Sequence, residues 1–177
     1  MKINAIIILI LLSLTAFRSD QHQQHGSMLP KKSAHHVGIV VKDIQVTARY
    51  WTQLLGIEKI PDVFMAVGHK DNPSHYRGNP TKATAKLMFF ELENLQIELI
   101  EPIGDAPSHW KEFLERKGGG VHHLAFEVEG LGEIYIDKFN ENGFPLVQHG
   151  GWDGGEYGYF DVLDSLGVTL ELLERYE

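Results

Sequence analysis

Two stretches of this sequence begin with adjacent histidines and continue as apolar, strand-like segments. The first is AHHVGIVV over residues 34–41, and the second is VHHLAFEV over residues 121–128. Each half also contains a later apolar segment with a glutamate in its middle, QIELIEP over 96–102 and TLELLER over 169–175. Imidazole and carboxylate groups are both ligands of divalent first-row metals. One of each in both halves therefore indicates a metal site shared between the halves.

The alternation of side chains along a strand indicates which residues share a face. Residues two apart point to the same side, so His36 shares a face with Gly38, and His123 with Ala125. The small residue beside each histidine leaves room on that face. We therefore expect both histidines to have space for a ligand or a partner.

Glu98 and Glu171 each lie between two aliphatic residues. A carboxylate at such a place either faces solvent or is buried, and a buried one needs a partner because an unpaired charge is costly. A single histidine or glutamate in a strand is more often an ordinary core or surface residue than a ligand. The recurrence of the pair in both halves favours the metal interpretation, since two imidazoles and two carboxylates around one divalent ion would satisfy all four groups.

The elements that carry these residues are predicted in the same order twice. A strand over 36–42 precedes a helix over 43–55, and a strand over 121–128 precedes a helix over 131–142. Further strands complete each half, which then reads roughly β-α-β-β-β. They are expected over residues 63–68, 84–92, 95–101, 144–149, 157–163 and 167–174.

The connections have distinct compositions. An amphipathic helix over 107–117 and the glycines 118–120 are expected to join the halves, and the glycine-rich segment 150–155 is expected to be a flexible loop. Residues 69–81 contain two Asn-Pro pairs and are expected to form a long loop. That loop is either an ordinary solvent-exposed segment or a source of substrate contacts. Its candidate side chains are His69, His75, Tyr76 and Arg77.

The composition excludes several kinds of protein. The 177 residues are 43% hydrophobic and 23% charged, values that fit one globular domain or two small modules with a shared core. A net charge of −8 argues against a nucleic-acid partner, which would require a basic surface. The absence of cysteine excludes disulfides and thiolate metal sites, so any metal must be bound by His, Asp or Glu.

The N-terminal residues differ from the rest. Residues 1–20 are predicted to be a signal peptide, because Lys2 precedes an apolar run over 5–17 that is shorter than the roughly 20 residues needed to span a bilayer. An uncleaved N-terminal anchor is the alternative. Residues 21–33 are predicted to be a polar linker, and 34–177 the folded domain. Both interpretations make the domain secreted or periplasmic, with no membrane contact beyond the N-terminal signal.

Several segments resemble the vicinal oxygen chelate superfamily, which includes glyoxalase I, methylmalonyl-CoA epimerase, extradiol dioxygenases and bleomycin resistance proteins. They are HHVGIVVKDI, YWTQLLGI, LQIELIEP, APSHWKEFLERKGGGVHHLAFEV and LGVTLELLE. The resemblance covers about residues 34–175. It implies an α+β fold of two βαβββ modules, about 34–103 and 120–176, with curved mixed sheets around a central metal cleft. The longest segment is most similar to methylmalonyl-CoA epimerase, and the order His, Glu, His, Glu resembles bacterial glyoxalase I.

The resemblance also implies the site and its chemistry. The implied ligands of one divalent ion (Zn, Ni, Co, Mn or Fe) are His36, Glu98, His123 and Glu171. Glu171 is the implied base, with Glu98 as a second catalytic carboxylate, and epimerases of this type have a further acid on the strand where this sequence has Lys86. The implied activity is that of a lyase or isomerase that removes a proton next to a carbonyl of a small substrate with two chelating oxygens.

Other interpretations remain open. A binding protein of the bleomycin-resistance type would hold a drug or metabolite in an aromatic-lined cleft without turnover, and an extracytoplasmic protein could keep the metal for structure alone. The presence of the full set of four ligands favours the enzyme. The resemblance leaves a homodimer open, and the sequence does not identify the substrate or the metal.

Overall fold

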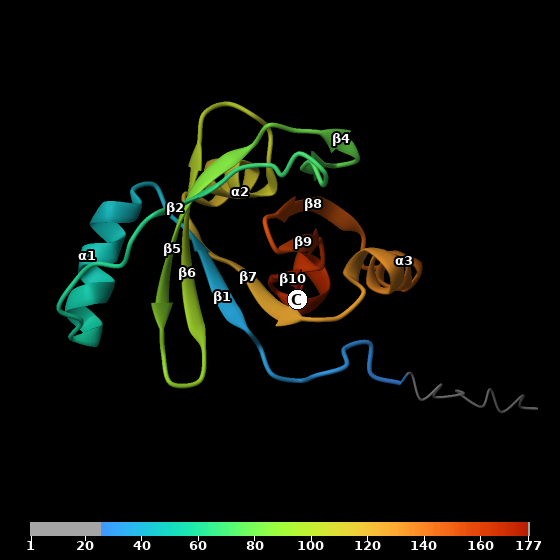
Figure 1. Ribbon diagram of the computed structural model, residues 1–177, viewed down its shortest axis with the longest axis horizontal. Coiled ribbons are helices and arrows are strands. Elements are labelled where there is room, and N and C mark those ends of the chain that lie inside the picture. Colours follow the sequence, from blue (N-terminus) through green and yellow to red (C-terminus); the bar gives the residue numbers. More distant parts are fainter. Residues whose placement is uncertain (1–25, 177) are drawn as a thin grey trace, which may run out of the picture.

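The computed structural model describes residues 26–176 of the chain (Figure 1). The predicted signal peptide over 1–20 lies outside the described residues, as does the start of the predicted linker over 21–33. Within the described part, no helix has the length and apolar character that a membrane crossing requires.

Each half of the chain contains one set of strands and a helical segment. The first half contains β1 (His36–Val40), α1 (Ile44–Leu55), β2 (Phe64–Ala66), β5 (Thr84–Glu91) and β6 (Gln96–Ile103). The second half contains β7 (Gly120–Glu127), the π-helix η1 (Leu131–Tyr135), α3 (Ile136–Glu141), β8 (Leu146–Trp152), β9 (Gly155–Phe160), the short α4 (Leu163–Leu166) and β10 (Thr169–Arg175). Between them lies α2 (His109–Lys117), and a short hairpin is formed by β3 (His75–Tyr76) and β4 (Asn79–Pro80).

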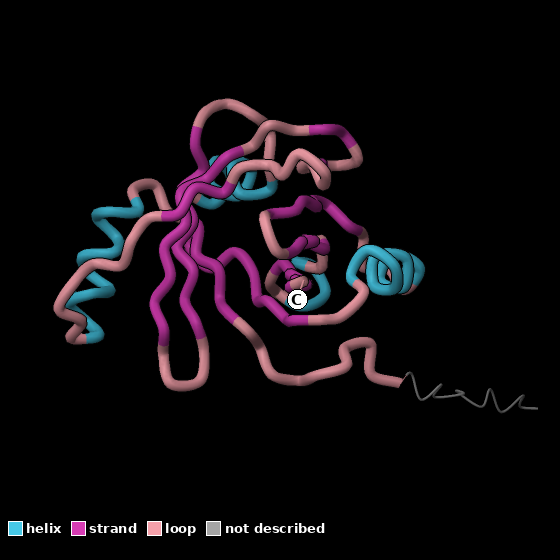
Figure 2. The backbone as a smooth tube through the Cα atoms, viewed as in Figure 1, coloured by secondary structure: helices cyan, strands magenta, loops and turns pink. Residues whose placement is uncertain are grey.

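All ten strands belong to one curled mixed sheet with the order β2-β5-β6-β1-β7-β10-β9-β8-β3-β4. The two halves join where β1 pairs antiparallel with β7, and the sheet curves into a half-barrel (Figure 2). In Figure 1, α1 and α3 lie at opposite ends of the view, each beside the strands of its own half. The predicted α+β fold of two βαβββ modules is confirmed.

The two faces of the sheet differ in their side chains. Towards α1, strands β5 and β6 present a core that includes Met88, Phe90 and Leu99. The alternating residues Phe89 and Glu98 point to the opposite face, where they line a cleft. This alternation separates the packed core from the face that carries the candidate site.

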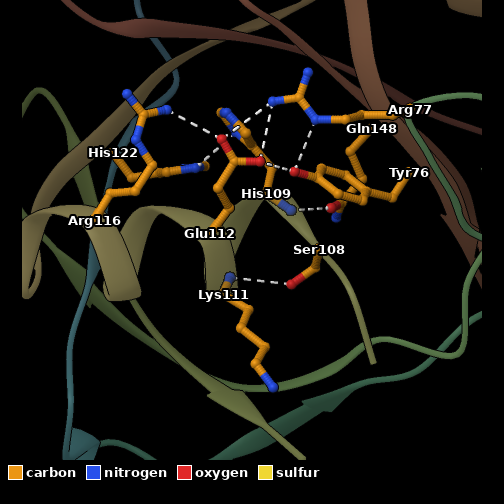
Figure 3. Close-up of polar contacts among 9 residues, drawn as sticks. All are labelled: Tyr76, Arg77, Ser108, His109, Lys111, Glu112, Arg116, His122 and Gln148. Atoms are coloured by element: carbon orange, nitrogen blue, oxygen red, sulfur yellow. Dashed lines mark hydrogen bonds and ion pairs between the residues drawn. The ribbon is translucent and has the colours of Figure 1, made fainter. Parts of the chain in front are cut away.

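The segment 69–81 does more than connect two strands of the first half. Its β3 strand pairs with β8 at the edge of the second half's strands. Tyr76 donates a hydrogen bond to Glu112 on α2, and Arg77 Nη2 lies 3.0 Å from the same carboxylate (Figure 3). Residues 75–77 therefore contact both β8 and α2.

The predicted flexible loop over 150–155 is wrong. Strand β8 continues to Trp152 and β9 begins at Gly155, which leaves a turn of only two residues. A Cβ added at Gly155 would lie 2.3 Å from the Trp152 ring and 2.4 Å from the carbonyl oxygen of Glu174. The glycines of this segment thus permit close packing of strands rather than mobility.

The predicted helix over 131–142 has the expected position but a different start. Its first five residues form the π-helix η1, and the residues that follow form α3. Both carboxylate oxygens of Glu174 accept hydrogen bonds at this start, from the backbone N–H groups of Gly130 at 2.8 Å and Leu131 at 2.7 Å. These bonds attach the beginning of the helical segment to β10.

Candidate metal centre

The register of the four central strands brings the predicted ligands together. Each histidine of β1 and β7 lies opposite a small residue of the other strand. That small residue also lies opposite a glutamate on the next strand of the sheet, β6 beside β1 and β10 beside β7. The two rows are Glu98–Gly38–His123 and Glu171–Ala125–His36. Because paired residues of neighbouring strands share a face of the sheet, the two rows place two imidazoles and two carboxylates around a common point.

The ligand atoms of these four residues all lie within 4.8 Å of one another. His36 Nε2 is 2.9 Å from His123 Nε2 and 2.8 Å from Glu171 Oε2. Glu98 Oε2 is 3.3 Å from the nitrogen of His36 and 3.4 Å from that of His123. No member of the set is more than 6% exposed. The structure therefore gathers the four residues at one buried point, while their role as metal ligands remains a prediction.

The small residue in each row is needed for this arrangement. A Cβ added at Gly38 would lie 1.9 Å from Cε1 and 2.3 Å from Nε2 of His123, so the imidazole occupies the space of the missing side chain. Ala125 takes the matching place beside His36 and is fully buried. The room that the sequence predicted beside each histidine is present.

Opposite charges compensate one another inside this cluster. Burial would lower the pKa of His36, but the carboxylates of Glu171 and Glu98 raise it to about 10. The pKa of His123 is raised by the same carboxylates against the effect of burial. In turn, burial would raise the pKa of Glu98 and of Glu171, and the two imidazoles hold both below the usual range. The carboxylates therefore favour the charged form of the imidazoles, and the imidazoles favour the charged form of the carboxylates.

Two oxygen atoms in this cluster lack hydrogen bonds. Oε2 of Glu98 and Oε2 of Glu171 are buried, and although both lie near imidazole nitrogens, neither accepts a hydrogen bond of good geometry. Buried oxygens without such partners are costly unless a cation binds them. Two nitrogens and two oxygens directed at one point fit a divalent ion of the Zn, Ni, Co, Mn or Fe type. The donor set does not distinguish among these metals.

A cleft of about 680 Å³ opens onto three of the four residues, His36, Glu98 and Glu171. The residues of β2 and β5 and the residue that follows β2 give the cleft an apolar wall, which consists of Phe64, Met65, Val67, Leu87 and Phe89. Trp152, Tyr157 and the buried Tyr159 also line the cleft. Basic side chains that line the same cleft are His35, His69, Lys70 and Arg175. The site can therefore admit a small molecule with an apolar part and an anionic part.

The candidate substrate contacts in segment 69–81 have different positions. His69 lines the cleft. Tyr76 and Arg77 instead bind Glu112 on α2 (Figure 3), and His75 Nδ1 lies 3.0 Å from the carbonyl oxygen of Pro73. Only His69 of the four predicted residues is therefore placed to meet a ligand, and the other three hold the segment in position.

The first histidine of each pair makes contacts that were not predicted from the sequence. His35 Nδ1 lies 2.9 Å from Nδ1 of His36, and His122 Nδ1 lies 2.9 Å from Nδ1 of His123. Each candidate ligand thus has another histidine bound to the ring nitrogen that faces away from the centre. The repeated His-His pair was the signal that could have indicated this arrangement.

Comparison with known proteins gives a family for this fold and site. Residues 35–160 match the family model described as the Glyoxalase/Bleomycin resistance protein/Dioxygenase superfamily. An ethylmalonyl-CoA/methylmalonyl-CoA epimerase of Cereibacter sphaeroides is 33% identical over 144 residues, which cover 78% of this chain and 94% of that protein. The protein YqjC of Bacillus subtilis is 28% identical over 143 residues, covering 78% and 89% respectively. A solved methylmalonyl-CoA epimerase from Mycobacterium tuberculosis, at 22% identity, shares the fold with a TM-score of 0.52 over 84% of this chain and 94% of that one.

Replacing Gly38 with alanine should displace the His123 ring. We expect Gly38→Ala to abolish high-affinity binding of Zn²⁺ and to destabilise the metal-free protein by about 1–3 kcal/mol, the usual cost of overpacking. Metal content after loading and chemical unfolding would measure the two effects. Gly68→Ala is the control, because a Cβ there meets only ordinary contacts at 3.5 Å. Unchanged metal binding in Gly38→Ala would contradict this account of the site.

Metal and protons should compete for His36. The pKa of His36, raised to about 10 by the two carboxylates, keeps this imidazole protonated at neutral pH without metal, and a ligand nitrogen must lose its proton. Binding of Zn²⁺ at pH 7 should therefore release the proton of His36, and the affinity should rise with pH towards about 10. Calorimetry in buffers of different protonation enthalpy would measure the release. An affinity that falls as pH rises would contradict the prediction.

Proposed function

The chain belongs to the Glyoxalase/Bleomycin resistance protein/Dioxygenase superfamily, and from this premise we propose that it is a metal-dependent isomerase or lyase that removes a proton next to a carbonyl group. The observation that carries the proposal is the buried set His36, Glu98, His123 and Glu171 at the base of the cleft. The substrate would be a small molecule whose two oxygens reach this set together.

In this proposal all four residues bind the ion, and Glu171 also transfers a proton. A divalent ion held by the four residues would supply Lewis acidity towards a carbonyl oxygen of the substrate. Glu171 would remove the proton from the adjacent carbon and return it, as a carboxylate base does. Its lowered pKa keeps it ionised at neutral pH, which is the state that a base requires.

Glu98 is the proposed second catalytic carboxylate. It comes from β6, whereas Glu171 comes from β10, and the paired strands β1 and β7 lie between them. Two carboxylates on either side of a bound carbon could serve its two faces, as an epimerisation requires. A proton transfer on one face would need Glu171 alone.

Other acids in the cleft are not placed to replace these two. Among the residues that the structure describes, Asp153 is the one acidic residue besides Glu98 and Glu171 that lines the cleft, and it lies in the exposed turn between β8 and β9. Lys86 on β5 pairs with Glu101 at 2.8 Å and does not line the cleft. These positions support one of the two buried glutamates as the proposed base.

The cleft and the relatives together define a first set of substrates. The apolar wall suits an acyl or alkyl part, and Arg175 and Lys70 suit an anionic group. The relatives' names make 2-substituted malonyl thioesters the first candidates. The predicted signal peptide favours an extracytoplasmic location. Thioesters of coenzyme A are metabolites of the cytoplasm and would not be available there. Free 2-hydroxy and 2-oxo acids therefore belong in the same panel.

A second candidate function is a binding protein without turnover, as in the drug-binding members of the superfamily. The aromatic lining supports it, since Phe64, Phe89, Trp152 and Tyr157 can enclose a ligand. A binding protein has no need for two buried carboxylates whose oxygens lack hydrogen bonds, so the enzyme is the better supported proposal.

Proton exchange at the substrate carbon tests the enzyme proposal. We expect the metal-loaded protein to exchange the α-proton of a panel member for deuterium in D₂O. Glu171→Gln should slow this exchange about 10²–10⁴-fold, the usual contribution of an acid–base group. The variant should still bind the metal, with equal or weaker affinity. NMR or mass spectrometry would follow the exchange. Glu129→Gln, at an exposed position, is the control.

Two outcomes would contradict the proposal. A wild-type protein that takes up no divalent metal would remove its basis. A metal-loaded protein that binds a panel member in the cleft without exchanging its α-proton would favour the binding protein instead.

A further inference from the structure

His122 lies behind the candidate ligand His123 and is fully buried. Its Nδ1 is 2.9 Å from Nδ1 of His123, and its Nε2 is 2.9 Å from Nδ1 of His109, the first residue of α2. The three rings form a continuous chain of contacts from the candidate metal centre to α2. Figure 3 shows the outer part of this chain, from His122 to His109.

The direction of the hydrogen bonds follows from the end at the metal centre. If His123 binds a cation through Nε2, its proton must lie on Nδ1, and this N–H donates to Nδ1 of His122. His122 then carries its own proton on Nε2 and donates to Nδ1 of His109. His109 is thus required as an acceptor at the end of the chain.

Both outer rings are positioned for this role. His122 is fully buried and has a histidine at each of its two ring nitrogens, and the buried His109 presents Nδ1 to it. A neutral imidazole has one donor and one acceptor, as each position in the chain requires. The ring of His122 also packs against Phe113 and Tyr159, at centroid distances of 5.0 and 5.2 Å.

The acceptor end of the chain is held by the fold. The backbone N–H of His109 donates to Oε1 of Gln148 on β8 at 2.7 Å, and Ser108 caps α2 by accepting from the N–H of Lys111 at 3.1 Å (Figure 3). Glu112, one turn later, binds Tyr76 and Arg77. The position of His109 is therefore held by its own bond to Gln148, by the helix cap at Ser108 and by the contacts of Glu112.

The other half of the site lacks an equivalent chain. His35 contacts His36 in the same way, but Nε2 of His35 lies 3.0 Å from Nη2 of Arg175. An arginine only donates hydrogen bonds, so it cannot accept one from His35. A donor chain that ends on an acceptor is therefore present behind His123 and absent behind His36.

We propose that His122 and His109 are positioning residues, which hold His123 with the lone pair of Nε2 directed at the bound ion. Hydrogen bonds to the second nitrogen of a ligand histidine fix its tautomer and ring orientation. The inference rests on the proposed function, because it requires that the four-residue cluster bind a divalent ion. It adds that affinity for the ion depends on a residue of α2 that does not contact it.

The test compares two substitutions of nearly equal shape at one position. In His109→Asn the side-chain oxygen takes the place of Nδ1 and keeps an acceptor, whereas His109→Leu removes it. We expect His109→Leu to weaken Co²⁺ binding about 10–100-fold and to change the visible spectrum of the bound Co²⁺. His109→Asn should keep the affinity and spectrum close to those of the wild type. Competition with a chromophoric chelator would give the affinities, and His75→Leu is the control.

A second measurement needs no substitution and stands even if His109→Leu fails to fold. In the Zn²⁺-loaded wild type, long-range ¹H–¹⁵N NMR spectra should show His122 and His109 each protonated on Nε2 and unprotonated on Nδ1. A proton on Nδ1 of either residue would overturn the inference, as would equal Co²⁺ affinity and spectra in the two variants.

These outcomes separate the inference from the proposed function. If the wild type binds Co²⁺ and the two variants behave alike, the positioning role is wrong and the proposed function stands. If the wild type binds neither Co²⁺ nor Zn²⁺, both are wrong.

Discussion

The antiparallel pairing of β1 with β7 is the constraint on which the site depends. It sets His36 opposite Ala125 and His123 opposite Gly38, so each imidazole enters space that a small residue leaves free. A shift of β7 by one residue would turn His123 and Ala125 to the opposite face of the sheet. The strand pairing that joins the two halves of the chain therefore also assembles the site.

The same pairing explains why such a charged cluster is tolerated inside the protein. A buried carboxylate or imidazolium is unfavourable alone, but two of each within a few ångströms compensate one another. This balance accounts for the raised pKa values of the histidines and the lowered values of the glutamates. A bound divalent ion would pair with the same two carboxylates, so a metal can replace imidazole protonation without leaving unpaired charge.

The fold class and the meeting of the four residues could be predicted from the sequence. The pattern that indicates them lies within short segments and occurs in both halves of the chain. Side-chain alternation placed His36 with Gly38, and the repeat linked them to His123. Other features depend on partners that are distant in the chain. Tyr76 and Arg77 bind Glu112, 36 and 35 residues away, and His109 contacts His122 from a helix. The turn around residues 153–154 was misjudged because glycine permits both flexibility and close packing.

The central claim is that one divalent ion binds at the point where the four side chains meet. Anomalous X-ray diffraction from crystals loaded with Zn²⁺ or Co²⁺ tests it most directly. The account predicts a single strong peak about 2.0–2.2 Å from Nε2 of His36, Nε2 of His123 and an oxygen of each of Glu98 and Glu171. A peak bound by other residues, or crystals of the loaded protein with no peak at this point, would contradict it.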